Sequence, residues 1–241
     1  MSANPQTLPA AARWGLASLS LSMLMPSLDT SIANVGLPTL AEAFGATFQE
    51  VRWVVIAYLI AITALIVSAG RLGDLFGRRR LLLAGIALFT LTSLLCGTAP
   101  TLSWLIAMRA AQGLGAAIMM ALTIAMVSET VPPARTGSAM GMLGTMSAIG
   151  TSLGPSLGGA LITALGWEAI FLINVPLGIF NLWLAWRYLP ADDLSAKAAS
   201  QGLDIGGTLL LVITLAAYAL ALTTARPGLA SMGLLSVAIL A

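Results

Sequence analysis

Long apolar runs separated by short polar stretches fill most of the chain. A helix needs about 20 apolar residues to cross a bilayer, and each run has roughly this length. The pattern therefore predicts membrane-spanning helices at about residues 14–35, 51–69, 81–98, 103–127, 137–164, 169–189 and 204–222, with an eighth that begins near Leu229 and reaches Ala241. The runs are continuous and do not alternate with a period of two, so an all-α membrane protein is expected rather than a membrane barrel.

Composition supports a membrane protein and narrows its chemistry. Of the 241 residues, 59% are hydrophobic and 8% are charged, whereas about a quarter of the residues in a soluble domain are charged. The chain has no histidine and one cysteine, Cys96, inside an apolar run. Disulfides, Cys/His zinc sites and histidine-based catalysis are therefore not expected. No phosphate-cradling P-loop occurs, which argues against direct use of ATP. We expect no enzyme, no metal site and no bound cofactor.

The placement of basic residues predicts the orientation of these spans. With residues 1–13 in the cytoplasm, eight bases fall inside and two, Arg52 and Arg226, fall outside, while Arg109 lies within a span. The cytoplasmic bases would be Arg13, Arg71, Arg78, Arg79, Arg80, Arg135, Arg187 and Lys197. Because cytoplasmic loops carry the excess of Lys and Arg, we expect a multi-pass protein of a plasma membrane, specifically a bacterial inner membrane, with a cytoplasmic N-terminus. Residues 190–203 would be a cytoplasmic linker, and a nucleic-acid partner is not expected.

A polar island at residues 70–82, GRLGDLFGRRRLL, separates the second and third runs. Gly70, Gly73 and Gly77 would allow a tight reversal. Asp74 would satisfy free N–H groups at a helix end and bond nearby arginines. With Gly70, Gly77, Arg78 and Arg79 it is a candidate for the inner gate. A generic cytoplasmic loop is the alternative interpretation. The order G-x-L-x-D-x-x-G-R-R, which includes Arg78 and Arg79, nevertheless resembles the signature between spans two and three of the major facilitator superfamily. Leu75 departs from that signature, since the family usually has a base there.

Two charged residues, Asp29 and Arg109, lie away from the ends of their predicted spans. Asp29 lies roughly 22 Å along the helix from Trp14, beyond the middle of the bilayer. Charged side chains are costly there and usually face a cavity or a partner, so both are candidates for proton coupling. The alternatives are an acid that reaches the outer interface and an arginine that only bonds backbone carbonyls. Gln112 shares a helical face with Arg109. Further substrate-path candidates are Asn34 and Tyr58, together with Gln112.

Several stretches resemble one branch of this family, the drug–proton antiporters with fourteen spans. LDTSIANVGLP at 28–38 and WVVIAYLIA at 53–61 are similar to its first two spans. Residues 105–117 match the span-four signature, in which the arginine at the position of Arg109 is associated with proton coupling. WEAIFLINVPLG at 167–178 resembles the entry to span six, although Glu168 stands where a base is common.

The fifth run carries a glycine repeat. Gly150, Gly154 and Gly158 form one smooth helix face, and Pro155 interrupts a backbone hydrogen bond. Simple helix packing is the plainer interpretation of such a repeat. Together with Pro155 and Gly159, the run resembles the antiporter signature found in exporters of the superfamily.

The resemblance implies a fold and a function. The family fold has two six-helix halves, each built of two inverted three-helix repeats, with the substrate held between the halves. Residues 14–189 would form the N-terminal half, and residues 204–241 the start of an inserted helix pair whose second helix is truncated. We expect a proton-driven antiporter that exports drugs or other small lipophilic compounds by alternating access and requires a missing C-terminal half. Its partners would be the substrate, protons and the lipid bilayer. A transporter of a metabolite or siderophore, a membrane sensor and a membrane-embedded enzyme remain the alternatives.

Overall fold

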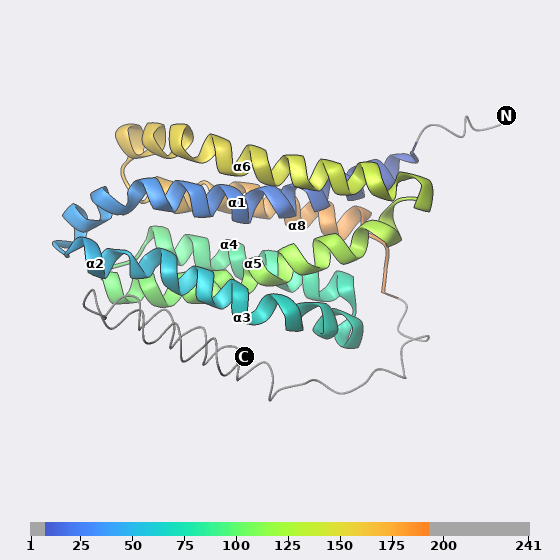
Figure 1. Cartoon of the computed structure of the whole chain (residues 1–241), viewed down its shortest axis with the longest axis horizontal. Helices are drawn as coiled ribbons and strands as arrows, with labels where there is room; N and C mark the ends of the chain where they lie inside the picture. Colours follow the sequence, from blue (N-terminus) through green and yellow to red (C-terminus); the bar gives the residue numbers. More distant parts are fainter. Residues whose placement is uncertain (1–7, 193–241) are drawn as a thin grey trace, which may run out of the picture.

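Six long helices run back and forth through the part of the chain that the computed structural model describes, residues 8–192 (Figure 1). They are α1 (Ala10–Phe44), α3 (Trp53–Phe76), α4 (Arg78–Gly97), α5 (Leu102–Thr130), α6 (Thr136–Leu165) and α8 (Asn174–Tyr188). Short helices α2 (Phe48–Val51), η1 (Pro133–Arg135) and α7 (Ala169–Leu172) connect them. The described chain contains no strand, so the prediction of an all-α fold is confirmed. The inserted helix pair predicted at 204–241 and most of the linker at 190–203 lie outside the described residues.

The helices extend beyond the apolar runs that predicted them. The first run was expected to end at residue 35, but α1 continues to Phe44 and stops at Gly45, whose φ of 58° is left-handed. A hydropathy pattern ends where polar residues begin, whereas a helix continues until its backbone is interrupted or capped. The structure also divides the predicted span at 169–189 into α7 and α8, with Ile173 between them.

Composition alone identifies five helices in the described residues that are long and apolar enough to cross a membrane. The first helix, α1, is not among them, because serines, two prolines and Asp29 lower its mean hydropathy. The polar side chains of Ser18, Ser22 and Asp29 are buried against other helices. Packing therefore explains how α1 accommodates them, and the count of six spans in residues 14–189 stays a prediction.

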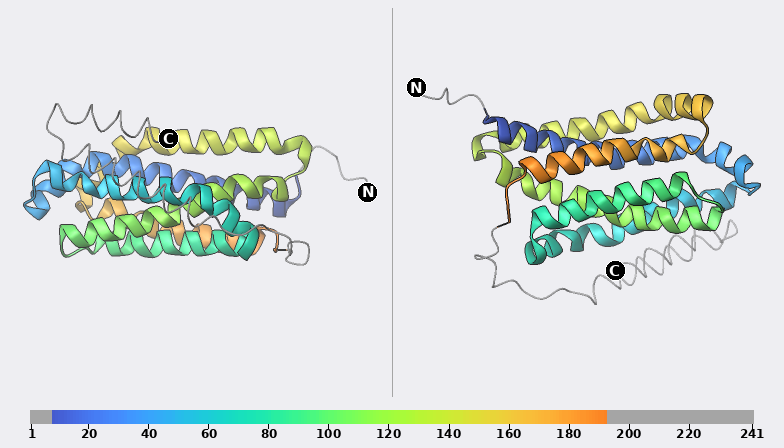
Figure 2. Two further views of the ribbon diagram at one scale, coloured as in Figure 1. Left: turned by 60° about the horizontal axis from the view of Figure 1, so that its bottom comes forward. Right: turned by 180° about the vertical axis from the view of Figure 1, so that it is seen from behind.

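The helices pair across the sequence rather than only with their neighbours. Helix α1 packs mainly on α6, and α5 packs on both α3 and α4. Helix α8 (orange) lies against α1 and α4, as the right-hand view in Figure 2 shows. Two apolar clusters fill the core: one includes Leu19 and Met25 of α1, the other Leu28 and Ile32. Asp29 lies on α1 between Leu28 and Ile32 of the second cluster, four residues after Met25 of the first.

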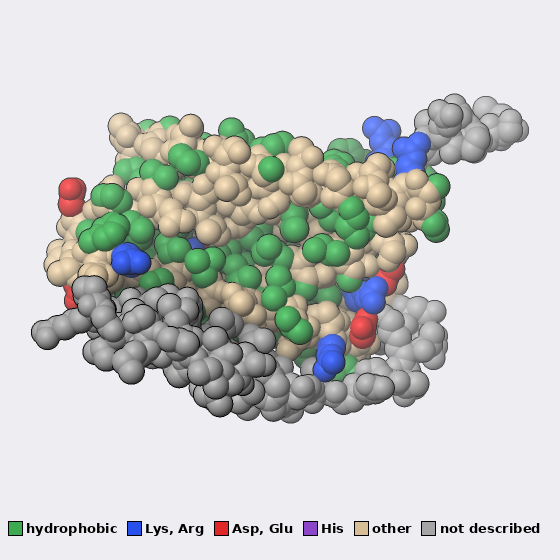
Figure 3. Space-filling view, viewed as in Figure 1, with side chains coloured by type: hydrophobic (Ala, Val, Ile, Leu, Met, Phe, Trp, Pro, Cys, Tyr) green, Lys and Arg blue, Asp and Glu red, His purple; other side chains and the backbone are tan. Residues whose placement is uncertain are grey.

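Basic residues gather at one end of the bundle, where α1 begins and where α3 and α8 end (Figure 3). We call this the basic end; it holds Arg13, Arg71, Arg78, Arg79, Arg80, Arg135 and Arg187, together with the acids Asp74, Glu129 and Asp192. The opposite end carries Arg52 together with three acids, Glu42, Glu50 and Glu168. Within residues 8–192, the bases predicted to be cytoplasmic thus share one end of the bundle, and the orientation itself stays a prediction.

The turn between α3 and α4 is tighter than expected. Gly70 and Gly73 were predicted to form the reversal, but both lie within α3, and Gly77 alone links the two helices with φ of 96°. Gly73 is needed for another reason: a Cβ atom there would overlap with Leu122 of α5. A Cβ at Gly70 would meet no atom within 4 Å. Gly77 therefore forms the turn, and Gly73 allows the close contact between α3 and α5.

Candidate functional site

The two charged residues predicted inside the membrane meet in the centre of the bundle. Asp29 of α1 and Arg109 of α5 form an ion pair, with 2.5 Å between Arg109 Nη1 and Asp29 Oδ2. Their side chains are 1% and 0% exposed. The alternative that Asp29 reaches the outer interface is thereby wrong. Arg109 also donates from Nε to the carbonyl oxygen of Val54 at 3.2 Å. It therefore bonds a backbone carbonyl and an acid at once.

Two buried amides complete the surroundings of this pair. Gln112 Nε2 donates to Asp29 Oδ1 at 3.2 Å, and Asn174 Nδ2 of α8 donates to the same oxygen at 2.8 Å. Gln112 Oε1 accepts from Arg109 Nη1 at 2.7 Å. We call Asp29, Arg109, Gln112 and Asn174 the central cluster. It joins α1, α5 and α8, and buried charges of this kind need such hydrogen bonds to offset lost hydration.

Aromatic rings enclose the guanidinium. Arg109 Cζ lies 4.1 Å from the centre of the Tyr58 ring and 5.6 Å from that of Phe171. Tyr58 is fully buried, and its hydroxyl donates to the carbonyl oxygen of Pro26 at 3.3 Å. The rings attract the cation through their quadrupoles. Because Tyr58 and Gln112 are fully buried, the structure places these two substrate-path candidates beside the ion pair and away from any exposed surface.

Sequence reasoning missed Asn174. The stretch that contains it was compared with span six as a whole, and no role was given to this amide. The available signal was its position two residues before Pro176, since Asn174 is the first residue of α8 after the interruption at Ile173. Within residues 8–192, no group of three or more His, Cys, Asp or Glu side chains could hold a metal ion.

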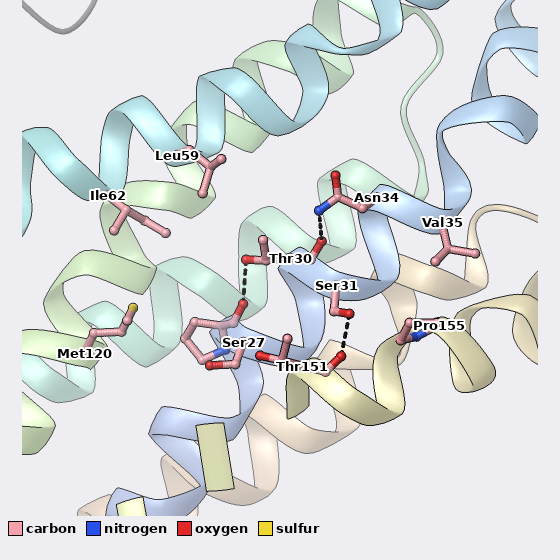
Figure 4. A pocket seen from close by; sticks show the side chains of 11 residues that line it. Ser27, Thr30, Ser31, Asn34, Val35, Leu59, Ile62, Met120, Thr151 and Pro155 are labelled. Carbon is pink, nitrogen blue, oxygen red and sulfur yellow. Dashed lines mark hydrogen bonds between the residues drawn. The ribbon is translucent and has the colours of Figure 1, made fainter. Parts of the chain in front are cut away.

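A pocket of about 440 Å³ opens between α1, α3, α5 and α6 (Figure 4). Its polar lining comes from Ser27, Thr30, Ser31, Asn34 and Thr151, and its apolar lining from Pro26, Val35, Leu59, Ile62, Met120 and Pro155. Of the three substrate-path candidates, Asn34 alone lines it, and its side chain donates to the carbonyl oxygen of Thr30 at 2.9 Å. Mostly apolar walls with a few polar groups suit a small lipophilic ligand.

The glycine repeat of α6 allows this helix to touch the backbone of α1. Cβ atoms at Gly150 and Gly154 would overlap with Leu24 O and with Ser31, respectively, and one at Gly158 would lie 3.3 Å from Ile32 Cγ2. Ser31 Oγ donates to the carbonyl oxygen of Thr151 at 2.7 Å across the same contact. A Cβ at Gly159 would meet nothing within 4 Å. Three glycines thus form the contact with α1, and Gly159 is outside it.

Charged side chains at the basic end tie four helices together. Arg78 Nη2 lies 2.8 Å from Asp74 Oδ1, and its Nη1 lies 2.9 Å from Glu129 Oε1 at the end of α5. Arg79 Nη2 donates to the carbonyl oxygen of Trp186 in α8. We call Asp74, Arg78 and Glu129 the basic-end network. The network contains two of the predicted gate residues, Asp74 and Arg78. A third predicted gate residue, Arg79, contacts α8 instead.

A different acid has the capping role predicted for Asp74. Asp192 accepts from the backbone N–H groups of Arg79 at 2.9 Å and Arg80 at 3.1 Å, at the start of α4. Asp74 cannot do so, because it lies in the last turn of α3 and bonds the Arg78 side chain. The prediction that Asp74 satisfies free N–H groups is therefore wrong. Asp192 was assigned only to the linker, because the chain reversal that returns it to α4 is not visible in the sequence.

Comparison with known proteins adds an independent line of support. A sequence model of the Major Facilitator Superfamily matches residues 19–241. The multidrug resistance protein Stp of Mycobacterium tuberculosis is 38% identical over 203 residues, which cover 84% of this chain and 37% of Stp. The riboflavin transporter RibZ of Clostridioides difficile is 38% identical over 192 residues, covering 80% of this chain and 42% of RibZ. The chain thus spans less than half the length of these curated relatives.

Solved structures show the same architecture. A bacterial homologue of the human lysosomal transporter Spinster, in an inward-facing and unoccupied conformation, superposes with a TM-score of 0.65. The alignment covers 83% of this chain and 47% of the other, at 16% sequence identity. At that identity the likeness concerns the fold alone.

Proposed function

The chain belongs to the Major Facilitator Superfamily, and from this premise we propose that the full-length protein is a proton-coupled exporter of small lipophilic compounds that works by alternating access. Its N-terminal half follows the family fold, with multidrug resistance proteins among its relatives. In this proposal the central cluster carries the coupling chemistry and the pocket between α1, α3, α5 and α6 contributes one wall of the substrate path. The energy source is the proton gradient, without a cofactor.

The observation that supports coupling most strongly is the buried ion pair of Asp29 and Arg109. Ionisable residues within membrane spans are costly and are usually retained for function. Protonation of Asp29 would remove the charge that balances Arg109, so the forces between α1 and α5 would change with each proton bound. A proton arriving at Asp29 can therefore favour one arrangement of the helices over another.

Two further features support alternating access. The glycine contact between α1 and α6 is close enough to seal the half against ions while the two halves of the full-length protein rock. The basic-end network links α3, α4 and α5 through exposed ion pairs, which can open and close at small cost. We propose that this network, with Gly70 in α3, Gly77 at the α3–α4 turn and Arg79 at the start of α4, is the inner gate, and that the basic end is cytoplasmic.

Transport of a metabolite is the second candidate. It is favoured by the riboflavin transporter RibZ, which matches this chain at the same identity as Stp. The pocket does not decide between the two substrates, because in this fold the other wall comes from the second half.

Transport assays test the proposal. Proteoliposomes that contain the full-length protein should move a lipophilic cationic dye when a pH gradient is imposed, and Asp29→Asn should abolish this movement while inserting normally. Equal dye movement with and without the gradient would contradict proton coupling. Movement of riboflavin without movement of the dye would favour the second candidate.

Cysteine labelling tests the orientation. In a Cys96→Ala background, single cysteines at Ala43 and Ala134 lie at opposite ends of the bundle, and both positions are exposed. In right-side-out vesicles, an impermeant reagent should label Ala43→Cys and leave Ala134→Cys unlabelled. Labelling of both from the same side would contradict the orientation.

A further inference from the structure

Asn174 brings a third helix to the central cluster. It is the first residue of α8, is fully buried, and donates from Nδ2 to Asp29 Oδ1 at 2.8 Å. Ile173, between α7 and α8, has right-handed helical backbone angles (φ −59°, ψ −28°), so the chain continues helically from α7 and presents Asn174 to Asp29. Asp29 is thus held by α1 itself, by α5 through Arg109 and by α8 through Asn174.

The two amides that touch Asp29 differ in how completely they are bonded. Gln112 Nε2 donates to Asp29 and, at 2.7 Å, to Ser93 Oγ. Its Oε1 accepts from Arg109 Nη1 and from the Cys96 thiol. Asn174 Nδ2 donates to Asp29, but Asn174 Oδ1 is buried and has no partner among the described residues. If the Gln112 amide turned over and exchanged its oxygen and nitrogen, its hydrogen bond to Arg109 would be lost. If the Asn174 amide turned over, only its hydrogen bond to Asp29 would be lost.

We propose that the Asn174 amide is a two-position switch that follows the protonation of Asp29. When Asp29 is ionised, the Asn174 N–H group donates to its carboxylate. When a proton from water binds Asp29 Oδ1, that oxygen becomes an O–H donor, and the amide turns about its Cβ–Cγ bond so that Oδ1 accepts. No other bond forms or breaks, and the proton returns to water when Asp29 ionises. This inference rests on the proposed protonation of Asp29.

The charged and titratable groups around Asp29 in the described structure cannot take the place of Asn174 as acceptor for the protonated carboxyl. The charged and titratable neighbours among the described residues are Arg109 of α5, the Tyr58 hydroxyl of α3 and the Cys96 thiol of α4. Arg109 has donors only. Tyr58 donates to Pro26 O, and Cys96 donates to Gln112 Oε1. Asn174 Oδ1 is therefore the buried acceptor next to the carboxyl that is still free.

The chain offers a matched control on the same helix. Asn181 lies seven residues further along α8 and is likewise fully buried. Its Oδ1 accepts from Ser18 Oγ and its Nδ2 donates to Ser22 Oγ, both at 2.8 Å. Asn181 is satisfied at both ends and touches no charged group in the described structure, so Asn181→Ala removes a buried amide without touching Asp29.

Infrared difference spectra between acidic and alkaline pH test the switch on the full-length protein. The carbonyl band of protonated Asp29 is identified by its loss in Asp29→Asn. We expect this band to shift in Asn174→Ala, because the acid loses its acceptor, and to stay in place in Asn181→Ala. We also expect bands of isotope-labelled asparagine in the wild-type spectrum, and this second measurement needs no variant at Asn174. An unshifted Asp29 band, absence of that band at any pH, or absence of labelled-amide bands would overturn the proposal.

Transport provides a readout that separates the two proposals. We expect Asn174→Ala to lower proton-driven dye movement roughly tenfold, the size expected when one hydrogen bond to a charged group is lost. The alanine control at Asn181 should retain most of this movement. Dye movement that ignores the pH gradient, together with a band shift in Asn174→Ala, would refute proton-coupled export and leave the amide switch standing. Intact proton-driven transport with no band shift would refute the switch and leave the exporter standing.

Discussion

The molecule contains two arginine–carboxylate arrangements in contrasting surroundings. At the basic end, Arg78 is 25% exposed, and its partners Asp74 and Glu129 are 44% and 37% exposed. In the centre, Arg109 is 0% and Asp29 1% exposed. The ion-pair distances are similar, but water reaches one arrangement and is excluded from the other.

This difference in solvation sets what each arrangement can do. Exposed pairs contribute about 0.2–1 kcal/mol because water and ions screen them. Removal of one partner from a buried pair costs about 3–5 kcal/mol because a charge is left unpaired. The basic-end network can therefore exchange partners during a conformational change, while the buried pair stays together until another charge, such as a proton, alters it.

The largest effect is expected from removal of the central guanidinium. Arg109→Ala leaves Asp29 buried without its cation, so we expect a loss of about 3–5 kcal/mol in stability and no proton-driven transport. Arg78→Ala should lower stability by no more than ~1 kcal/mol. Thermal unfolding in detergent and transport per inserted molecule measure both. Equal losses of stability in the two variants would contradict the proposed difference between the buried and the exposed ion pairs.

The second-largest effect is expected at the contact between α1 and α6, which depends on helix packing rather than on charge. Gly154→Val introduces a side chain where a Cβ already overlaps with Ser31, two residues after Asp29. We expect a membrane-inserted protein with little export, because a close-packed interface has no spare volume. Gly159→Val is the matched control, since that position is open, and it should transport normally. Pro155→Ala should be milder than Gly154→Val.

Two outcomes of the Gly154→Val experiment would count against a seal between α1 and α6. Normal transport per inserted molecule by Gly154→Val would contradict the seal between α1 and α6. A fall in thermal stability and expression that parallels the fall in activity would indicate that this contact only holds the helices together. Comparison with Gly159→Val shows whether the added valine itself, rather than its position, causes the change.

A smaller effect is expected at the basic end. Asp74→Asn removes the charge that pairs with Arg78 and should shift the balance between inward- and outward-open states about fivefold, the equivalent of ~1 kcal/mol. Labelling rates of Ala139→Cys, at a position that is buried near the basic end, should then rise in the full-length protein. Unchanged labelling would mean that Asp74 contributes to topology or folding and not to the gate.

A change in ionic strength should give the smallest effect, but it should distinguish the basic-end network from the central cluster most clearly. Raising salt from about 0.1 M to about 1 M shortens the Debye length from about 10 Å to about 3 Å. We expect the Asp74→Asn shift to shrink in high salt, because the wild-type network is already weakened there. The stability lost in Arg109→Ala should hardly change. A salt dependence of similar size at both sites would show that water reaches the central cluster.

The sequence was sufficient to nominate Asp29 and Arg109, since a charge in an apolar run is conspicuous. It could not show that they touch, because they are 80 residues apart on helices that pair only in the fold. Asn174 was missed for a related reason: one amide hardly changes the hydropathy of a span. Helix ends were also placed too early, since α1 and α3 continue through polar residues that an apolar pattern excludes.

Asp192 has a mechanical consequence. Its carboxylate holds the first backbone amides of α4, and a Cβ at Gly77 would lie 2.5 Å from its Oδ2, so this acid is lodged against the α3–α4 turn. Displacement of Asp192 would therefore disturb the start of α4 as well as the chain that follows α8. Through this carboxylate, the position of Asp192 is coupled to the turn that also carries Arg78.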